Sequence, residues 1–228
     1  MKNNFIVSLG TWSGFIWITM VCTMWFLSEW FPPFAPDLTA IELADIYKEN
    51  NFQLLLGGVL MMLSGLVLGP YVSVLVLLIE KVEKKMGVVS IAMIMTGATS
   101  VINVCLSGIF WAAAAFRPDR NPEVIQGLSD IAWLFFFGGI SAFLGLIGWV
   151  AYASLVLDDR KNPVFSRWFG YLCLWTTIVT LPDILVFFFK TGPFAWDGLI
   201  GFWIPLVLFV VTFNASPFAL RKSVKNHL

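Results

Sequence analysis

The sequence predicts an all-α polytopic membrane protein, a bundle of six transmembrane helices with short interfacial helices in exterior loops 1 and 3. Of the 228 residues, 59% are hydrophobic and 12% are charged, whereas soluble domains carry about 25% charged residues. Six apolar stretches have the length of about 20 residues that a helix needs to cross about 30 Å of hydrocarbon. A helix satisfies its own backbone hydrogen bonds in lipid, so each stretch is predicted to be helical. We expect residues 1–228 to form a single transmembrane domain.

The predicted spans cover residues 5–30, 52–79, 88–116, 131–157, 168–189 and 199–220. The first is predicted to be an uncleaved span, because its apolar run is too long for a signal peptide and ends in "SEWFPPF". Glycines recur in the second and fourth spans, including the GxxxG pair Gly65 and Gly69. Small residues let helices approach closely in lipid, so we expect these two spans to pack together at the centre. Pro70 predicts a bend in the second span.

The distribution of basic residues predicts the orientation of the spans. Ten of the 14 Lys and Arg residues fall in the N-terminus, the second and fourth loops and the C-terminal tail. The other three loops hold only Lys48, Arg117, Arg120 and Lys190. Short basic loops stay in the cytoplasm, so both termini are predicted to be cytoplasmic.

Two exterior loops carry signals of helix initiation. In the first, Thr39 and Glu42 have the spacing of a capping box, which predicts a short helix on the membrane interface. In the third, Asn121 is a candidate N-cap and Pro122 suits the first helical position. We expect a second short helix there, leading into the fourth span.

Composition excludes several classes of function. The net charge is zero, and no basic, aromatic-rich tract indicates nucleic-acid binding. The three cysteines are isolated in apolar runs and the single histidine is His227, so we expect no cofactor and no metal site. Sequence motifs of the common hydrolases and nucleotide-binding enzymes are absent, so a catalytic role is not favoured. A lipid-modifying enzyme that uses acids of the exterior side remains a third interpretation.

Asp183 lies in the outer half of the fifth predicted span, directly after Pro182. A charged side chain at the bilayer centre costs about 2.5–3.5 kcal/mol on insertion scales, so the carboxylate should face the bundle and find a partner. Polar residues of other spans fall at a similar depth and predict an outward-facing cavity. The candidate ligand-binding residues are Asp183, Asn103, Ser107, Thr180, Tyr71, Thr19, Thr23 and Arg117.

Two interpretations of Asp183 remain open at this point. In the first, Arg117, Lys190 or threonine hydroxyls neutralise the carboxylate, which then only holds the helices in register. In the second, Asp183 marks a ligand or proton site, because an acid within the membrane is a functional hypothesis by default.

Three segments resemble a group of bacterial integral membrane proteins found in mycobacteria and proteobacteria, for which no activity is known. They are "FPPFAPDLTAIELADIYKEN" (31–50), "FWAAAAFRPDRNPEVIQGLSDIAWLFF" (110–136) and "PVFSRWFGYLCLWTTIVTLPDILVFFFKTGPFAWDGLIGFWIP" (163–205). The resemblance implies a location in the bacterial inner membrane. It supplies no substrate and no site residues.

The leading hypothesis is a non-enzymatic inner-membrane protein that binds, and transports, a small and largely apolar molecule near Asp183. The alternative is an accessory or structural subunit of a larger membrane complex. The expected partners are the lipid bilayer, a small apolar ligand, and a second copy of the chain or another membrane subunit.

Overall fold

The computed structural model describes residues 4–228, and the regular structure in this part of the chain is helical. The α-helices are α1 (Asn4–Leu27), α2 (Ala40–Glu49), α3 (Asn51–Glu83), α4 (Val88–Ala115), α5 (Pro122–Gly138), α6 (Ile140–Tyr152), α7 (Arg167–Thr180) and α8 (Ile204–His227). Three short segments have other helical geometries: the π-helical turns η1 (Ala153–Leu157) and η3 (Leu199–Trp203), and the 3₁₀ segment η2 (Leu181–Phe187).

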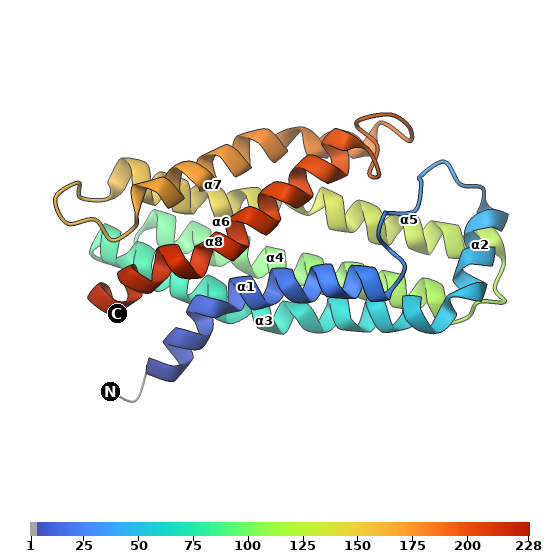
Figure 1. Cartoon of the computed structure of the whole chain (residues 1–228), viewed down its shortest axis with the longest axis horizontal. Helices are drawn as coiled ribbons and strands as arrows, with labels where there is room; N and C mark the ends of the chain where they lie inside the picture. Colours follow the sequence, from blue (N-terminus) through green and yellow to red (C-terminus); the bar gives the residue numbers. More distant parts are fainter. Residues whose placement is uncertain (1–3) are drawn as a thin grey trace.

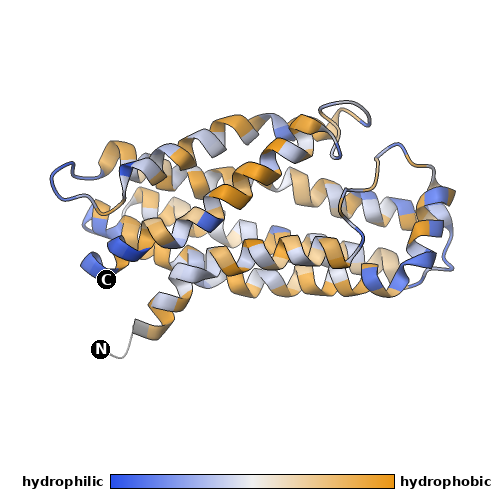
Figure 2. Ribbon diagram, in the orientation of Figure 1, coloured by the Kyte–Doolittle hydropathy of each residue, from blue (hydrophilic) through white to orange (hydrophobic). Residues whose placement is uncertain are grey.

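Six helical stretches are long and apolar enough to cross a membrane, which confirms the all-α polytopic prediction. Their bounds are Phe5–Leu27, Asn51–Glu83, Val88–Ala115, Pro122–Leu157, Arg167–Phe187 and Leu199–His227. The long helices run side by side, with the beginning of α1 and the C-terminus at one end of the bundle and α2 at the other (Figure 1). Hydrophilic residues gather at these two ends and apolar residues cover the bodies of the helices (Figure 2). The division of the bundle into two polar ends agrees with the loops assigned from the sequence.

The closest backbone approach that we expected between the second and fourth spans lies instead between the second and third. Helix α3 packs mainly against α4 and α1. A Cβ atom on Gly58 would lie 2.5 Å from the backbone nitrogen of Ala112 and 2.8 Å from the carbonyl oxygen of Gly108. Glycine is therefore required where α3 and α4 touch. The predicted GxxxG pair contributes to this interface only through Gly65, whose Cβ position would lie 2.7 Å from the Cys105 sulfur on α4, whereas Gly69 has no neighbour near its Cβ position.

The predicted capping box at the start of α2 is present. The backbone N–H of Glu42 donates to the Thr39 hydroxyl at 3.3 Å, and the backbone N–H of Thr39 donates to the Glu42 carboxylate at 2.9 Å. Hydrogen bonds from Thr39 lower the pKa of Glu42 below its ordinary value. The first loop thus contains the short helix that local sequence predicts.

The second predicted short helix is part of a longer one. The backbone N–H of Glu123 donates to the Asn121 side chain at 2.9 Å and a helix does begin at Pro122, as expected. That helix continues without a break to Gly138, so the fourth span begins at Pro122 and not near residue 131. The helix continues through the polar residues Glu123, Gln126 and Asp130 because Ile125 and Ser129 on the same segment are buried against the bundle.

Helix α2 and its flanking loop are held against the bundle by hydrogen bonds to distant parts of the chain. The Tyr47 hydroxyl donates to Ser129 on α5 at 3.1 Å. The Gln126 amide donates to the carbonyl of Leu38 at 3.0 Å, and the Trp196 indole donates to the carbonyl of Phe34 at 2.7 Å. These contacts fix loops 1 and 5 together at the α2 end.

The last three spans depart from α-helical geometry, whereas the first three are α-helical throughout their length. The fourth is interrupted at Gly139 between α5 and α6, the fifth changes to the 3₁₀ segment η2, and the sixth starts with the π-helical turn η3. Segment η2 packs against η3, α5 and α6, so these irregularities lie close together in space. Asp183, which lies on η2, is therefore close to the interruption at Gly139 and to η3.

Candidate functional site

Asp183 lies in the first turn of η2, and only 1% of its surface is exposed. Its position follows from Pro182, which lacks a backbone N–H and crowds the preceding helical turn. Helix α7 accordingly ends at Thr180, and the chain continues as the tighter 3₁₀ segment. The carboxylate is therefore carried into the bundle by a segment that is not an ordinary α-helix.

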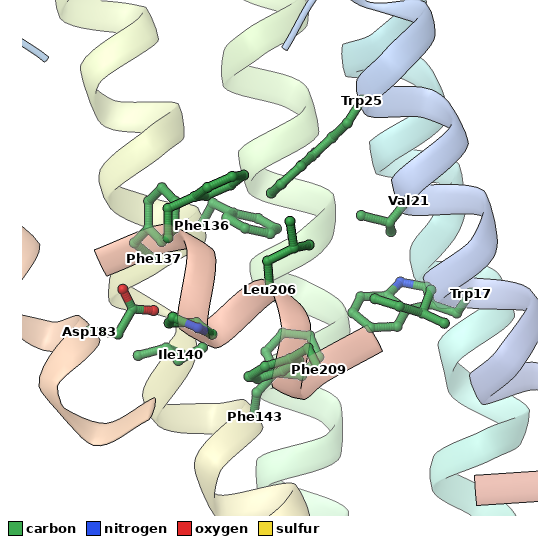
Figure 3. Close-up of a pocket in the computed structure, with 13 residues that line it drawn as sticks. Trp17, Val21, Trp25, Phe136, Phe137, Ile140, Phe143, Asp183, Leu206 and Phe209 are labelled. Carbon is green, nitrogen blue, oxygen red and sulfur yellow. The ribbon is translucent and has the colours of Figure 1, made fainter. Parts of the chain in front are cut away.

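Asp183 forms part of the wall of an internal cavity of about 60 Å³ (Figure 3). The wall comes from α1, α5, α6, η2, η3 and α8, and most of its members are buried. The residues are Trp17, Ile18, Val21, Trp25, Phe136, Phe137, Ile140, Phe143, Asp183, Phe202, Pro205, Leu206 and Phe209. Asp183 is the one charged member among them, and seven of the others are aromatic. The cavity is thus lined mainly by aromatic rings and contains one acid.

The polar atoms at this cavity have no partners within the described chain. Neither carboxylate oxygen of Asp183 accepts a hydrogen bond from residues 4–228. The indole N–H groups of Trp17 and Trp25 are also buried and unpaired. In Figure 3 these two indoles lie across the cavity from Asp183. Buried polar groups are normally hydrogen-bonded, so this arrangement calls for a specific explanation.

The expected neutralising partners do not lie at Asp183. Arg117 is exposed, with its guanidinium carbon 5.9 Å from the centre of the Phe116 ring. Lys190 is also exposed. Within residues 4–228, the salt bridge that forms joins Lys48 to Asp119 at 3.0 Å. The interpretation of Asp183 as one half of an ion pair is therefore not supported.

Two of the candidate residues face away from the cavity. Thr19 and Thr23 do share one face of α1, as their spacing predicts, but that face is exposed on the outside of the bundle. The opposite side of α1 directs Trp17, Val21 and Trp25 toward the cavity. Periodicity identifies a common face correctly and leaves its direction undetermined, because lipid and protein interior are similarly apolar.

Asn103 and Ser107 form a separate polar group on α4. The Ser107 hydroxyl donates to the carbonyl of Asn103 at 2.9 Å, and the Asn103 amide donates to the carbonyl of Phe135. The Asn103 side chain lies so close to Gly139 that a Cβ atom there would overlap it. Asn103 lines a groove of about 500 Å³ together with Phe135, Gly138 and Phe187. The groove is distinct from the Asp183 cavity, and the α5–α6 junction and η2 contribute to both walls.

Thr180 and Tyr71 are buried near the cavity without lining it. The Thr180 hydroxyl donates to the carbonyl of Thr176 at 2.6 Å, so its hydrogen-bonding capacity is used within α7. The Tyr71 ring packs against Phe213 with 5.4 Å between centroids, and Phe213 in turn contacts Trp17 at 4.8 Å. Tyr71 therefore does not touch the cavity directly, and it contacts the wall residue Trp17 only through Phe213. Helix α3 passes through Pro70 as one continuous helix.

Sequence analysis did not identify the aromatic wall. Its strongest local signal is the spacing of Trp17, Val21 and Trp25, which places two indoles on one face of the first span. The phenylalanines come from two other stretches far from the first span in the sequence, one across α5 and α6 (Phe136, Phe137 and Phe143) and one across η3 and α8 (Phe202 and Phe209). Only the packing of the helices brings them together around the acid.

The fold and this site define a multi-pass, all-α membrane protein with a small, aromatic internal cavity. Comparison with protein-family models, with curated proteins and with solved structures gives no match for this chain. Within residues 4–228, no group of three or more His, Cys, Asp and Glu side chains is arranged to hold a metal ion. The residues that line the Asp183 cavity are the observation from which a function is inferred below.

Proposed function

We propose that this chain is a non-enzymatic protein of the bacterial inner membrane that binds a small, largely apolar molecule in the cavity around Asp183, and moves that molecule across the membrane. The observation that carries the proposal is that both carboxylate oxygens of Asp183 are buried in this cavity without a partner from residues 4–228. A ligand that donates to Asp183 would supply the missing interaction.

The energetics of burial support a ligand more than a structural role. A buried polar group that lacks a partner costs about 1–3 kcal/mol, and more when it is charged. A carboxylate that served only to hold two helices in register would contact a donor on the second helix. Asp183 contacts none in residues 4–228, and the rest of the wall is apolar except for the two indole N–H groups. The free-energy cost of burying an unpaired carboxylate has a functional explanation if that carboxylate binds a ligand.

The irregular geometry around Asp183 is a second support. π-helical turns inside α-helices occur frequently at functional sites. In transporters, interrupted helices near the middle of the membrane form the binding sites of substrates. Here the Gly139 break, η2 and η3 belong to three consecutive spans and meet at one acid. This arrangement favours movement of a bound molecule over passive structural support.

The distribution of charge supports the proposed orientation. The turn after α3, the loop after η1 and the C-terminal tail lie at one end of the bundle (Figure 1), and they carry most of the basic residues. Lys2, which the sequence also assigns to this side, lies outside the described residues. Both termini would then be cytoplasmic, and η2 would lie toward the exterior. The resemblance to bacterial inner-membrane proteins supports the choice of membrane.

The proposal is tested by ligand-induced stabilisation of the purified protein in detergent micelles. The probes are trimethylammonium, acetone, isopropanol and acetate, which have the same number of heavy atoms and differ in charge and polarity. At least one probe should raise the thermal unfolding temperature of the parent with a saturating concentration dependence. The stabilisation should disappear in Asp183→Asn and persist in Asp197→Asn, an acid that does not line the cavity. A parent that none of the four probes stabilises would contradict the proposed function.

A further inference from the structure

We infer that the ligand of the Asp183 cavity is a compact organic cation of the alkylammonium type. The inference rests on the binding function proposed above and specifies its ligand class. It follows from three properties of the cavity: the sign of its charge, the nature of its wall and its size.

The charge of the cavity favours a cation. Asp183 is buried, and no lysine, arginine or histidine lines the cavity within residues 4–228. An ionised carboxylate without a counter-charge is strongly unfavourable in a medium of low dielectric constant. A bound cation would supply that counter-charge, and an ammonium N–H would donate to the unpaired oxygens. An anion would be repelled, and a neutral apolar molecule would leave the carboxylate without a partner.

The aromatic wall also favours a cation. The faces of aromatic rings carry partial negative charge and attract alkylammonium groups, an interaction that strengthens when the site is dry. Trp17 is stacked against Phe143 with 5.4 Å between centroids, and Trp25 against Phe202 with 5.3 Å. These stacks hold both indoles in place before a ligand arrives, which reduces the entropy lost on binding. The wall thus provides fixed aromatic surfaces opposite the carboxylate (Figure 3).

The same wall argues against a bare metal ion. Ca²⁺ takes about six to eight oxygen ligands, and Mg²⁺ dehydrates reluctantly. The cavity offers the two oxygens of a single carboxylate, surrounded by hydrocarbon. These cannot replace the hydration shell of such a divalent metal ion. An alkylammonium ion needs few hydrogen bonds, and its carbon atoms can contact the aromatic rings directly.

The volume limits the ligand to a few heavy atoms. The cavity measures about 60 Å³. At about 10–15 Å³ for each water-sized position, it holds about four to six such positions. Trimethylammonium and smaller alkylammonium ions match this size. A long-chain or polycyclic cation would require the surrounding helices to separate.

The test compares trimethylammonium with its neutral and anionic counterparts on the full chain in detergent micelles, with sodium chloride as the control for ionic strength. We expect trimethylammonium chloride to raise the unfolding temperature of the parent in a saturating manner. Acetone, isopropanol and sodium acetate at equal concentration should have little effect. If acetone or isopropanol stabilises the parent as much as trimethylammonium does, the cation inference is overturned while the proposed function stands. If no probe acts, the proposed function itself fails.

Substitutions at two residues examine the groups that would recognise the cation. Asp183→Asn keeps the shape of the side chain and removes its charge, and we expect it to weaken trimethylammonium binding at least about 30-fold. Trp17→Leu should weaken binding about 3-fold to about 30-fold through loss of the aromatic face, while Trp17→Phe should retain most of it. Parent-like affinity in Asp183→Asn would overturn the inference. Even if a variant fails to fold, the comparison of the four probes on the parent shows whether the cavity prefers a cation.

Discussion

At the scale of single residues, Asp183 is expected to lower the stability of the ligand-free protein. Its two oxygens are buried among apolar side chains without a hydrogen-bond donor from residues 4–228. Burial of this kind costs free energy that a hydrophobic residue of similar size would not. Binding sites commonly contain residues that reduce stability in exchange for function. A structural tie would have the opposite effect, so stability measurements distinguish the two interpretations of this residue.

We predict that Asp183→Leu raises the free energy of unfolding of the ligand-free protein by about 1–3 kcal/mol, because it removes a buried, unpaired polar group. Asp183→Asn should lie between the parent and Asp183→Leu. Thermal unfolding in detergent micelles measures the change, with Asp197→Leu as the control for loss of an acid elsewhere. Marked destabilisation by both Asp183 variants would show that the carboxylate has a structural partner.

At the scale of helical elements, the first three spans and the last three are built differently. Helices α3 and α4 approach until their backbones touch near Gly58 and Gly108. Close packing of this kind stabilises helix pairs in lipid, where the hydrophobic effect gives little help. The later spans, by contrast, are interrupted near the cavity. The α3–α4 pair is thus suited to serve as a rigid support for a more adaptable second half.

We predict that Gly58→Ala destabilises the bundle by about 1–3 kcal/mol, because the added methyl group would collide with the backbone of α4. Gly69→Ala is the matched control on the same helix, since nothing lies near its Cβ position. It should leave stability unchanged or raise it slightly, because alanine is the better helix former. Thermal unfolding of both variants compares them directly. Equal effects would show that the close approach at Gly58 does not stabilise the pair.

A second element-scale prediction concerns the capping box of α2. The pKa of Glu42 is lowered by hydrogen bonds from Thr39, so the ionised carboxylate is the form that stabilises the cap. This stabilisation is present above the ordinary pKa of a glutamate and is lost as the pH falls through the lowered value. Thr39→Ala should increase hydrogen exchange of the first turn of α2 at neutral pH. In the parent, exchange relative to the intrinsic rate should increase only in acid, and an unchanged Thr39→Ala profile would argue against the cap.

At the scale of the whole molecule, the bundle has two different ends. One carries the C-terminus and the loops that contain most of the basic residues (Figures 1 and 2). The other carries α2, which is tied to loop 5 by the hydrogen bond from Trp196 to Phe34. Basic loops are retained in the cytoplasm during insertion, so this asymmetry supports the proposed orientation, with the α2 end facing outward. In that proposed orientation, segment η2 and the cavity would lie closer to the exterior.

We predict that alkaline phosphatase fused after residue 228 is inactive in bacterial cells, while the same enzyme fused after Arg120 is active. The enzyme needs the oxidising environment outside the cytoplasm to form its disulfides. Immunoblots of both fusions control for expression. Activity in the reverse pattern would place the termini outside and invert the proposed orientation.

The sequence by itself determined the elements whose energetics are local. Each span is recognised from a run of apolar residues, because a helix satisfies its backbone hydrogen bonds within its own segment. The capping box of Thr39 and Glu42 and the start of a helix at Pro122 are likewise matters of a few neighbouring residues. Asp183 also stood out from sequence alone, because a charged residue in such surroundings is costly.

Only the tertiary structure decided which surfaces of these elements face each other. The spans are apolar on most sides, and lipid resembles the protein interior, so periodicity could not show that Thr19 and Thr23 face outward while Trp17 and Trp25 face inward. The pairing of α3 with α4 depends on where two glycine surfaces meet in space. The lack of a partner for Asp183 among residues 4–228, and the aromatic wall around it, arise from contacts between segments far apart in the chain. Such contacts depend on how side chains of separate helices fit together, and no local pattern encodes that fit.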